Sequence, residues 1–152
     1  MGDVGECYKG ICPITMKDIE FFDHTADVGI RLTRPSLETL FEDAALAMFH
    51  IIAPNNEFYF NVDYEINIES NNREELLVNW LSELNFCFQV KGYVPVTFDL
   101  VLFENGLSAV VHGDVFDPSQ HNVEIEIKAV TYHKMYLLQQ KDHWSAQIIF
   151  DI

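Results

Sequence analysis

The chain is poor in basic residues, and this shortage restricts the kinds of partner it can have. Nine Lys and Arg oppose 24 Asp and Glu among 152 residues, which gives a formal net charge of −15. A surface this negative repels phosphate backbones, so we expect no direct nucleic-acid binding. The same charge attracts cations or a basic protein partner over long range, although it could equally serve solubility alone.

Long apolar runs are also absent. No window of about 18 uncharged apolar residues exists, and the N-terminus lacks the basic-then-apolar order of a signal peptide. We therefore expect neither a membrane span nor secretion. The three cysteines, Cys7, Cys12 and Cys87, are an odd number and too few for a disulfide framework, which fits a reducing compartment. The expected location is cytoplasmic, with the nucleus also open in a eukaryotic cell.

Signatures of common enzyme classes are missing as well. The sequence contains neither G-x-G-x-x-G nor a Walker motif, so no Gly-rich nucleotide loop is predicted. It also lacks G-x-S-x-G and H-E-x-x-H, which removes two recognisable hydrolase signatures.

The apolar content is sufficient for one domain. Hydrophobic residues make up 49% of the chain and include twelve Phe, enough for a sizeable core at this length. Residues 1–16 show no sustained periodicity and are interpreted as a loose leader. The domain is therefore expected over residues 17–152.

Two helices are predicted from capping residues and apolar stripes. Ser36 is a suitable N-cap for a helix that runs to Ile52. Asn72 and Glu75 have the spacing of a capping box for a second helix, which ends at Gly92. The expected lengths are about sixteen and nineteen residues.

The remaining segments alternate with the period of strands. Asn105-Gly106, between two of them, is a strong hairpin signal. The expected strands are 19–22, 28–32, 58–68, 94–103, 107–116, 123–130 continuing over 132–138, and 144–150. The predicted fold is a single α+β domain, a mixed β-sheet of about seven strands with two helices packed on one face.

Residues able to bind a cation gather near both ends of the chain. Residues 23–27 form an acidic turn, and Asp151 places a side-chain carboxylate beside the main-chain oxygens of Ile152. Oxygen donors without thiolates or a His pair suit Ca²⁺ or Mg²⁺ better than zinc. The sequence thus suggests a hard-cation site closed by the two ends, while an ordinary solvated Asp151 is the simpler alternative.

Three strings in this order resemble the archease family. They are Asp23-His24-Thr25-Ala26-Asp27-Val28-Gly29-Ile30, Lys128-Ala129-Val130-Thr131-Tyr132-His133 and Phe150-Asp151-Ile152. Residues 36–49 are similar to that family's first helix, and the resemblance covers residues 17–152. It implies a non-catalytic accessory protein that binds the tRNA-splicing ligase RtcB transiently and promotes its guanylylation and multiple turnover. It also implies a divalent-metal site formed by Asp27, Asp151 and Ile152.

Three further residues lie in these strings. His24 could bind the metal or a partner group, although a hydrogen bond to the neighbouring Asp23 is the simpler interpretation. His133 is expected to be hydrogen-bonded and partly buried near the site. Lys128 could neutralise the acids or touch the partner, and a simple surface lysine is equally consistent.

Two other function classes stay open at this point. In the first, Asp27 and Asp151 hold a cation that activates water, with His24 or His133 as base. Such a metal-dependent hydrolase needs a roomy pocket. In the second, the protein is a chaperone-like scaffold that uses its acidic surface and has no metal dependence.

Overall fold

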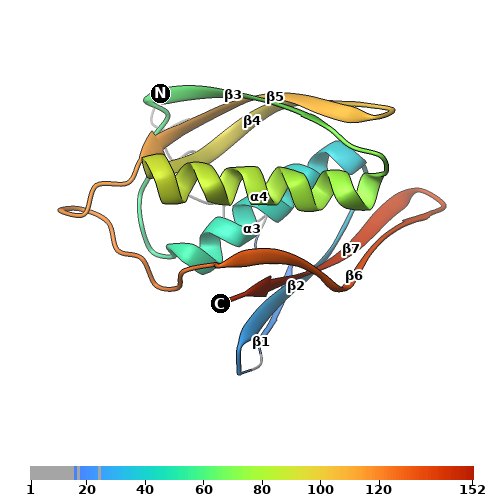
Figure 1. The fold of residues 1–152 in the computed structure, drawn as a ribbon, viewed down its shortest axis with the longest axis horizontal. Coiled ribbons are helices and arrows are strands. Elements are labelled where there is room, and N and C mark those ends of the chain that lie inside the picture. The colour runs from blue at the N-terminus through green and yellow to red at the C-terminus, as the bar shows by residue number, and fades with distance from the viewer. Residues whose placement is uncertain (1–15, 17, 24) are drawn as a thin grey trace.

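The computed structural model describes residues 16, 18–23 and 25–152, and this part of the chain forms seven strands and two helices (Figure 1). In chain order they are β1 Glu20–Asp23, β2 Asp27–Arg34, α3 Leu37–Ile52, β3 Val62–Glu69, α4 Arg73–Lys91, β4 Tyr93–Phe103, β5 Gly106–Val115, β6 Ala129–Gln140 and β7 His143–Asp151. None of the described helices is long and apolar enough to cross a lipid bilayer. The predicted leader, residues 1–16, lies outside the described residues except for Met16, which packs against the core.

Both helices begin where local sequence signals place them. Ser36 Oγ accepts a hydrogen bond from the Thr39 N–H at 3.1 Å, and Asn72 Oδ1 accepts one from the Glu75 N–H at 2.8 Å. These bonds satisfy backbone donors that a helix leaves free in its first turn. The helices contain 16 and 19 residues, as predicted.

The strands form two sheets instead of one. The four-stranded sheet has the order β1-β2-β7-β6, the three-stranded sheet has the order β3-β5-β4, and every pairing is antiparallel. The α+β class is confirmed, whereas the expected single mixed sheet is wrong. Period-two alternation identifies a strand with one buried face, but it does not say which other strand supplies the hydrogen bonds.

Both helices lie between the two sheets and contact strands of each (Figure 1). They therefore do not cover one face of a single sheet. Trp80 of α4 is fully buried and donates its Nε1–H to the Phe41 carbonyl of α3 at 3.0 Å. Helix α3 fits this enclosed position because its apolar residues are not confined to one stripe. Its buried residues are Leu37, Leu40, Phe41, Ala44, Ala45, Ala47, Met48, Phe49, Ile51 and Ile52. Each sheet has an inner face on the helices and an outer face directed away from them.

Two predicted strand segments lie outside the sheets. Strand β3 begins at Val62, so residues 58–61 precede it. Residues 123–128 belong to no strand. Instead, the N–H groups of Glu124 and Ile125 donate to the Ile52 carbonyl, at 2.7 and 3.3 Å. The end of a helix leaves carbonyls free, and this segment satisfies one of them.

The β4–β5 hairpin turns one residue earlier than predicted. Glu104 and Asn105 form the turn, and Gly106 already pairs with Phe103. A Cβ atom at Gly106 would collide with the Ile68 carbonyl of β3. The neighbouring strand, and not the turn, therefore requires glycine at this position.

Candidate metal centre at the end of strands β2 and β7

The pairing of β2 with β7 brings the two predicted acidic ligands together. Asp27 lies directly opposite Asp151, and the next residues, Val28 and Phe150, are paired and buried. Side chains directly opposite each other in an antiparallel pair project to the same face, with Cβ atoms about 4.5–5.5 Å apart. Because alternate residues project to opposite faces, both carboxylates lie on the outer face. We call Asp27 and Asp151 the acid pair.

Two main-chain hydrogen bonds hold the peptide group that joins Asp151 to Ile152. The Lys128 N–H donates to the Asp151 carbonyl at 2.7 Å, and the Ile152 N–H donates to the Ala26 carbonyl at 3.2 Å. Ile152 is therefore held against the β1–β2 turn, next to Asp27. The structure thus places Asp27, Asp151 and Ile152 at one end of the sheet.

The other predicted site residues are placed differently. Lys128 is exposed beside Asp151 and contacts it through its backbone. His133 is exposed, so its expected partial burial is wrong. It lies in an interruption of the β6–β7 pairing, where alternation no longer decides which side chains are buried. Its main-chain N–H donates to Thr131 Oγ1 at 3.2 Å. His24 lies outside the described residues.

The row of residues next to the acid pair is apolar and closely packed. A Cβ atom on Gly29 would overlap the Phe22 ring and lie within 2.8 Å of Ile149 Cδ1. Ile149 belongs to the outer face, yet it is only 4% exposed. The Arg31 guanidinium lies 4.3 Å from the centroid of the Phe22 ring. Gly29 therefore makes room for an aromatic ring that covers the sheet beside the acid pair.

A line of polar groups crosses all four strands of this sheet. Arg31 of β2 donates to Glu20 of β1 at 2.5 Å and to Gln147 Oε1 of β7 at 2.6 Å. Gln147 in turn donates its Nε2–H to the Lys134 carbonyl of β6 at 2.7 Å. No local sequence pattern predicts this line, because its members come from four separate segments.

The donor set at the acid pair suits a hard cation. Among the described residues, neither Asp27 nor Asp151 has an ion-pair partner. Two negative charges therefore lie side by side without an ion pair to any described residue, and a divalent cation would stabilise them. No group of three or more His, Cys, Asp or Glu side chains in the described part of the chain is placed to hold a metal. A third protein ligand would have to be a main-chain oxygen, as Ile152 can provide, and such oxygen donors favour Ca²⁺ or Mg²⁺.

Two concavities in the described part of the chain lie away from the acid pair. A concavity of about 1200 Å³ is lined by the end of β3, the β4–β5 turn and the start of α4. A second one, of about 520 Å³, lies between the start of α3 and Trp144. Neither is lined by Asp27, Asp151 or Ile152. Metal-dependent hydrolysis relies on a cavity that shapes the substrate and limits water, and neither of these two concavities supplies one at the acid pair.

A separate group of titratable residues lies on and beside the three-stranded sheet. His112 is hydrogen-bonded to Asp99 at 2.9 Å and to Asp63 at 2.8 Å, and these two carboxylates raise its pKa. Glu42 of α3 is half-buried, and its pKa is raised to about 7, mainly by desolvation and further by the charge of Asp43. These groups belong to the other sheet and to α3, so they take no part in the acid pair.

Comparison with known proteins agrees with the resemblance seen in the sequence. Residues 19–152 match the Archease protein family (MTH1598/TM1083). A protein archease from Methanosarcina barkeri is 38% identical over 141 residues, which cover 90% of this chain and 97% of that protein. A protein archease from Pyrococcus furiosus is 34% identical over 142 residues, which cover 90% of this chain and 100% of the relative.

Solved structures show the same fold. The solution structure of a Methanobacterium thermoautotrophicum protein has a TM-score of 0.77 at 33% identity, covering 90% of this chain and 100% of that one. The crystal structure of a Thermotoga maritima protein, described as an archease and possible chaperone, has a TM-score of 0.61 at 19% identity. The match covers 86% of this chain and 94% of that one. The second likeness concerns the fold alone. This small α+β chain, in which two sheets enclose two helices, belongs to the archease family.

Proposed function

We propose that this protein is a non-catalytic accessory factor that activates an RNA-splicing ligase of the RtcB type during tRNA splicing. Membership of the archease family supports an accessory role. The observation that carries the proposal is the acid pair, in which the β2–β7 register aligns two carboxylates from distant parts of the chain. Neither carboxylate is compensated by an ion pair among the described residues.

In this proposal Asp27, Asp151 and the main-chain oxygens of Ile152 hold a divalent cation of the Ca²⁺ or Mg²⁺ class. When bound, the cation would supply positive charge able to polarise phosphate oxygens. Asp27 is half-buried and Asp151 is exposed, so the carboxylates remain accessible from solvent. An ion held in this way is presented to a partner instead of being enclosed for a reaction within the protein.

The chemistry then belongs to the ligase. The protein promotes ligase guanylylation, the attachment of GMP to the ligase's own histidine, and thereby multiple turnover. Lys128, exposed beside Asp151, is suited to contact the ligase during a transient encounter. A chain with a net charge of −15 is not expected to bind bare RNA itself. The proposed location is the cytoplasm, or also the nucleus in a eukaryotic cell.

A chaperone-like scaffold is the second candidate, and exposed apolar side chains favour it. Val101 and Phe103 are 56% and 55% exposed on the outer face of the three-stranded sheet. Neighbouring exposed apolar residues often mark a surface that holds another protein. A scaffold of this kind would need no metal, so metal dependence separates the two candidates.

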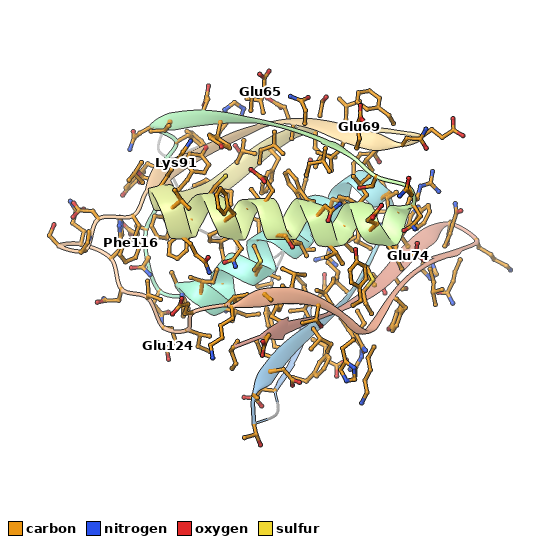
Figure 2. All side chains as sticks on the ribbon, in the orientation of Figure 1. Glu65, Glu69, Glu74, Lys91, Phe116 and Glu124 are labelled. Carbon is orange, nitrogen blue, oxygen red and sulfur yellow. The ribbon has the colours of Figure 1, made fainter. Side chains whose placement is uncertain are left out.

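The test is multiple-turnover RNA ligation by an RtcB-type ligase, with and without this protein, before and after a chelator removes the divalent cation from it. We expect activation that depends on the cation. Asp27→Asn removes one charge from the acid pair at nearly constant size and should reduce activation by about tenfold or more. Glu65→Gln is the matched control, because Glu65 is an exposed carboxylate on the outer side of β3 (Figure 2).

Three outcomes would change the proposal. Full activation by a folded Asp27→Asn protein would exclude the acid pair as the functional site. Activation that needs no cation would favour the scaffold. Turnover of phosphoesters by this protein alone, lost in Asp27→Asn, would favour the hydrolase.

A further inference from the structure

A large bulge interrupts β6 where it pairs with β7. Residues 132–135 all lie opposite the single residue Ile148 of β7. Within this bulge Lys134 has a φ of 54°, a left-handed backbone conformation that lysine rarely adopts. Bulges re-aim side chains and are frequent beside functional sites. The 132–135 bulge is therefore a candidate recognition element.

The bulge lies over the outer face of the four-stranded sheet, which also carries the acid pair. Gln147 projects to that face, because it is in phase with Asp151 along β7. Gln147 donates its Nε2–H to the Lys134 carbonyl at 2.7 Å and is only 9% exposed. Gln147 and Asp151 are separated by about 13 Å, at about 3.3 Å per strand residue. The bulge and the acid pair are thus two parts of one face.

The bulge presents polar side chains to solvent. Tyr132 is 57% exposed, and His133 and Lys134 are also exposed. Neither Lys134 nor Lys128 has an ion-pair partner in the described part of the chain. The bulge, about 13 Å along the sheet from Asp151, thus presents a phenol, an imidazole and an ammonium group, and Lys128 presents a second ammonium group beside Asp151. All four groups are able to donate hydrogen bonds to an anion.

The outer faces of the two sheets differ in their exposed lysines. The structure describes seven of the nine Lys and Arg residues. Two of the seven, Lys128 and Lys134, are exposed on the side of the four-stranded sheet that carries the acid pair and have no ion-pair partner among the described residues. The outer face of the three-stranded sheet carries no described Lys or Arg but has five carboxylates, those of Asp63, Glu65, Glu69, Asp99 and Asp114. Charge complementarity directs an anionic group to the four-stranded side.

We propose that the 132–135 bulge and the acid pair form one docking surface for the nucleotide phosphates bound at the centre of the ligase, an inference that rests on the proposed function. Lys134 and His133 donate to the phosphate oxygens. Tyr132 is an exposed aromatic residue of the kind that anchors interfaces. A long RNA backbone fits less well, because the carboxylates elsewhere on the surface repel an extended row of phosphates.

The test compares Lys134→Glu with Lys141→Glu. Both lysines are exposed and have positive φ, 54° and 30°, so the two variants make the same change of charge in similar backbone settings. Calorimetry with the cation-loaded protein measures binding to the nucleotide-loaded and the nucleotide-free ligase. We expect Lys134→Glu to weaken binding to the loaded ligase by about tenfold or more and to reduce the preference for that form. Lys141→Glu should change binding by less than about twofold.

A second variant protects the test against misfolding. Lys134→Gly removes the ammonium group while glycine adopts the positive φ freely, so it should weaken binding with an unchanged melting temperature. Wild-type binding by both Lys134 variants, in a protein that activates the ligase, would overturn the docking surface and leave the proposed function standing. Failure of the wild type to activate would overturn both. Micromolar binding to bare RNA that disappears in Lys134→Glu would assign the surface to RNA instead.

Discussion

The outer face of the three-stranded sheet carries more carboxylates than that of the four-stranded sheet, yet the candidate cation site lies on the latter. On the three-stranded sheet, His112 lies between Asp63 and Asp99 and is hydrogen-bonded to both. On the four-stranded sheet, Asp27 and Asp151 lie opposite each other with no ion pair among the described residues. One sheet compensates its converging acids internally, and on the other we propose that an external cation compensates them.

For attracting a cation, the distance between two carboxylates matters more than the number of carboxylates on a face. Glu65 and Glu69 lie on the same strand and face, and four residues of strand separate them by about 13 Å. Each is therefore solvated separately. Directly opposed residues of an antiparallel pair approach to about 5 Å, so two carboxylates there repel each other and together attract an ion.

The largest expected effect is the loss of Ca²⁺ affinity when one carboxylate of the acid pair is neutralised, compared with neutralising a carboxylate on the other sheet. Asp151→Asn should lower Ca²⁺ affinity by about tenfold or more, because the single carboxylate of Asp27 attracts the ion less. Glu69→Gln should leave the affinity unchanged. Calorimetric titration measures both, and thermal unfolding should show stabilities within about 1 kcal/mol of the wild type, because both side chains are exposed. Equal Ca²⁺ affinities would show that the acid pair is not the cation site.

Residues added after Ile152 should have the next largest effect. The extension places an amide and extra bulk beside Asp27 and Asp151, where the proposed main-chain ligand lies. Ca²⁺ affinity and ligase activation should both fall, and the same tag at the N-terminus serves as the control that changes neither. If the two tagged proteins bind Ca²⁺ equally, the acid pair takes its remaining ligands from elsewhere.

Gly29→Ala should have a moderate effect, mainly on stability. The added methyl group must displace the Phe22 ring or Ile149, and overpacking of this kind costs about 1–3 kcal/mol. Thr33→Ser, at an exposed position on the same strand, keeps the hydroxyl that is hydrogen-bonded to Ser145 and should change stability by less than about 0.5 kcal/mol. Urea unfolding measures both variants. An unchanged urea midpoint for Gly29→Ala would mean that an alanine side chain fits beside the Phe22 ring without cost.

The smallest effect is expected from His112→Gln on the three-stranded sheet. Hydrogen bonds to Asp99 and Asp63 raise the pKa of His112, so its protonated form stabilises the folded state. That contribution is complete below the unfolded pKa of about 6.5 and is lost as the pH rises through the higher folded-state pKa. The variant should therefore melt below the wild type near about pH 5.5 and approach it near about pH 9. A melting difference that does not vary with pH would contradict this, and Ca²⁺ affinity should stay unchanged.

Local signals predicted local structure well. Ser36 and Asn72 bind N–H groups three residues ahead, so the sequence reveals both caps. His133 shows where such reasoning fails. Its expected burial assumed a regular strand, and the bulge in β6 changes the phase of the alternation.

The amino-acid sequence by itself determined the two helices and their ends, the strand character of most segments, the net charge and the family resemblance. Only the tertiary structure decided that the strands divide into two sheets around the helices, that Asp27 lies opposite Asp151, and that the bulge lies over the same face. The physical reason is the separation along the sequence between the residues that interact. Caps and alternation act between residues a few positions apart, whereas strand partners and register depend on packing the whole core at once.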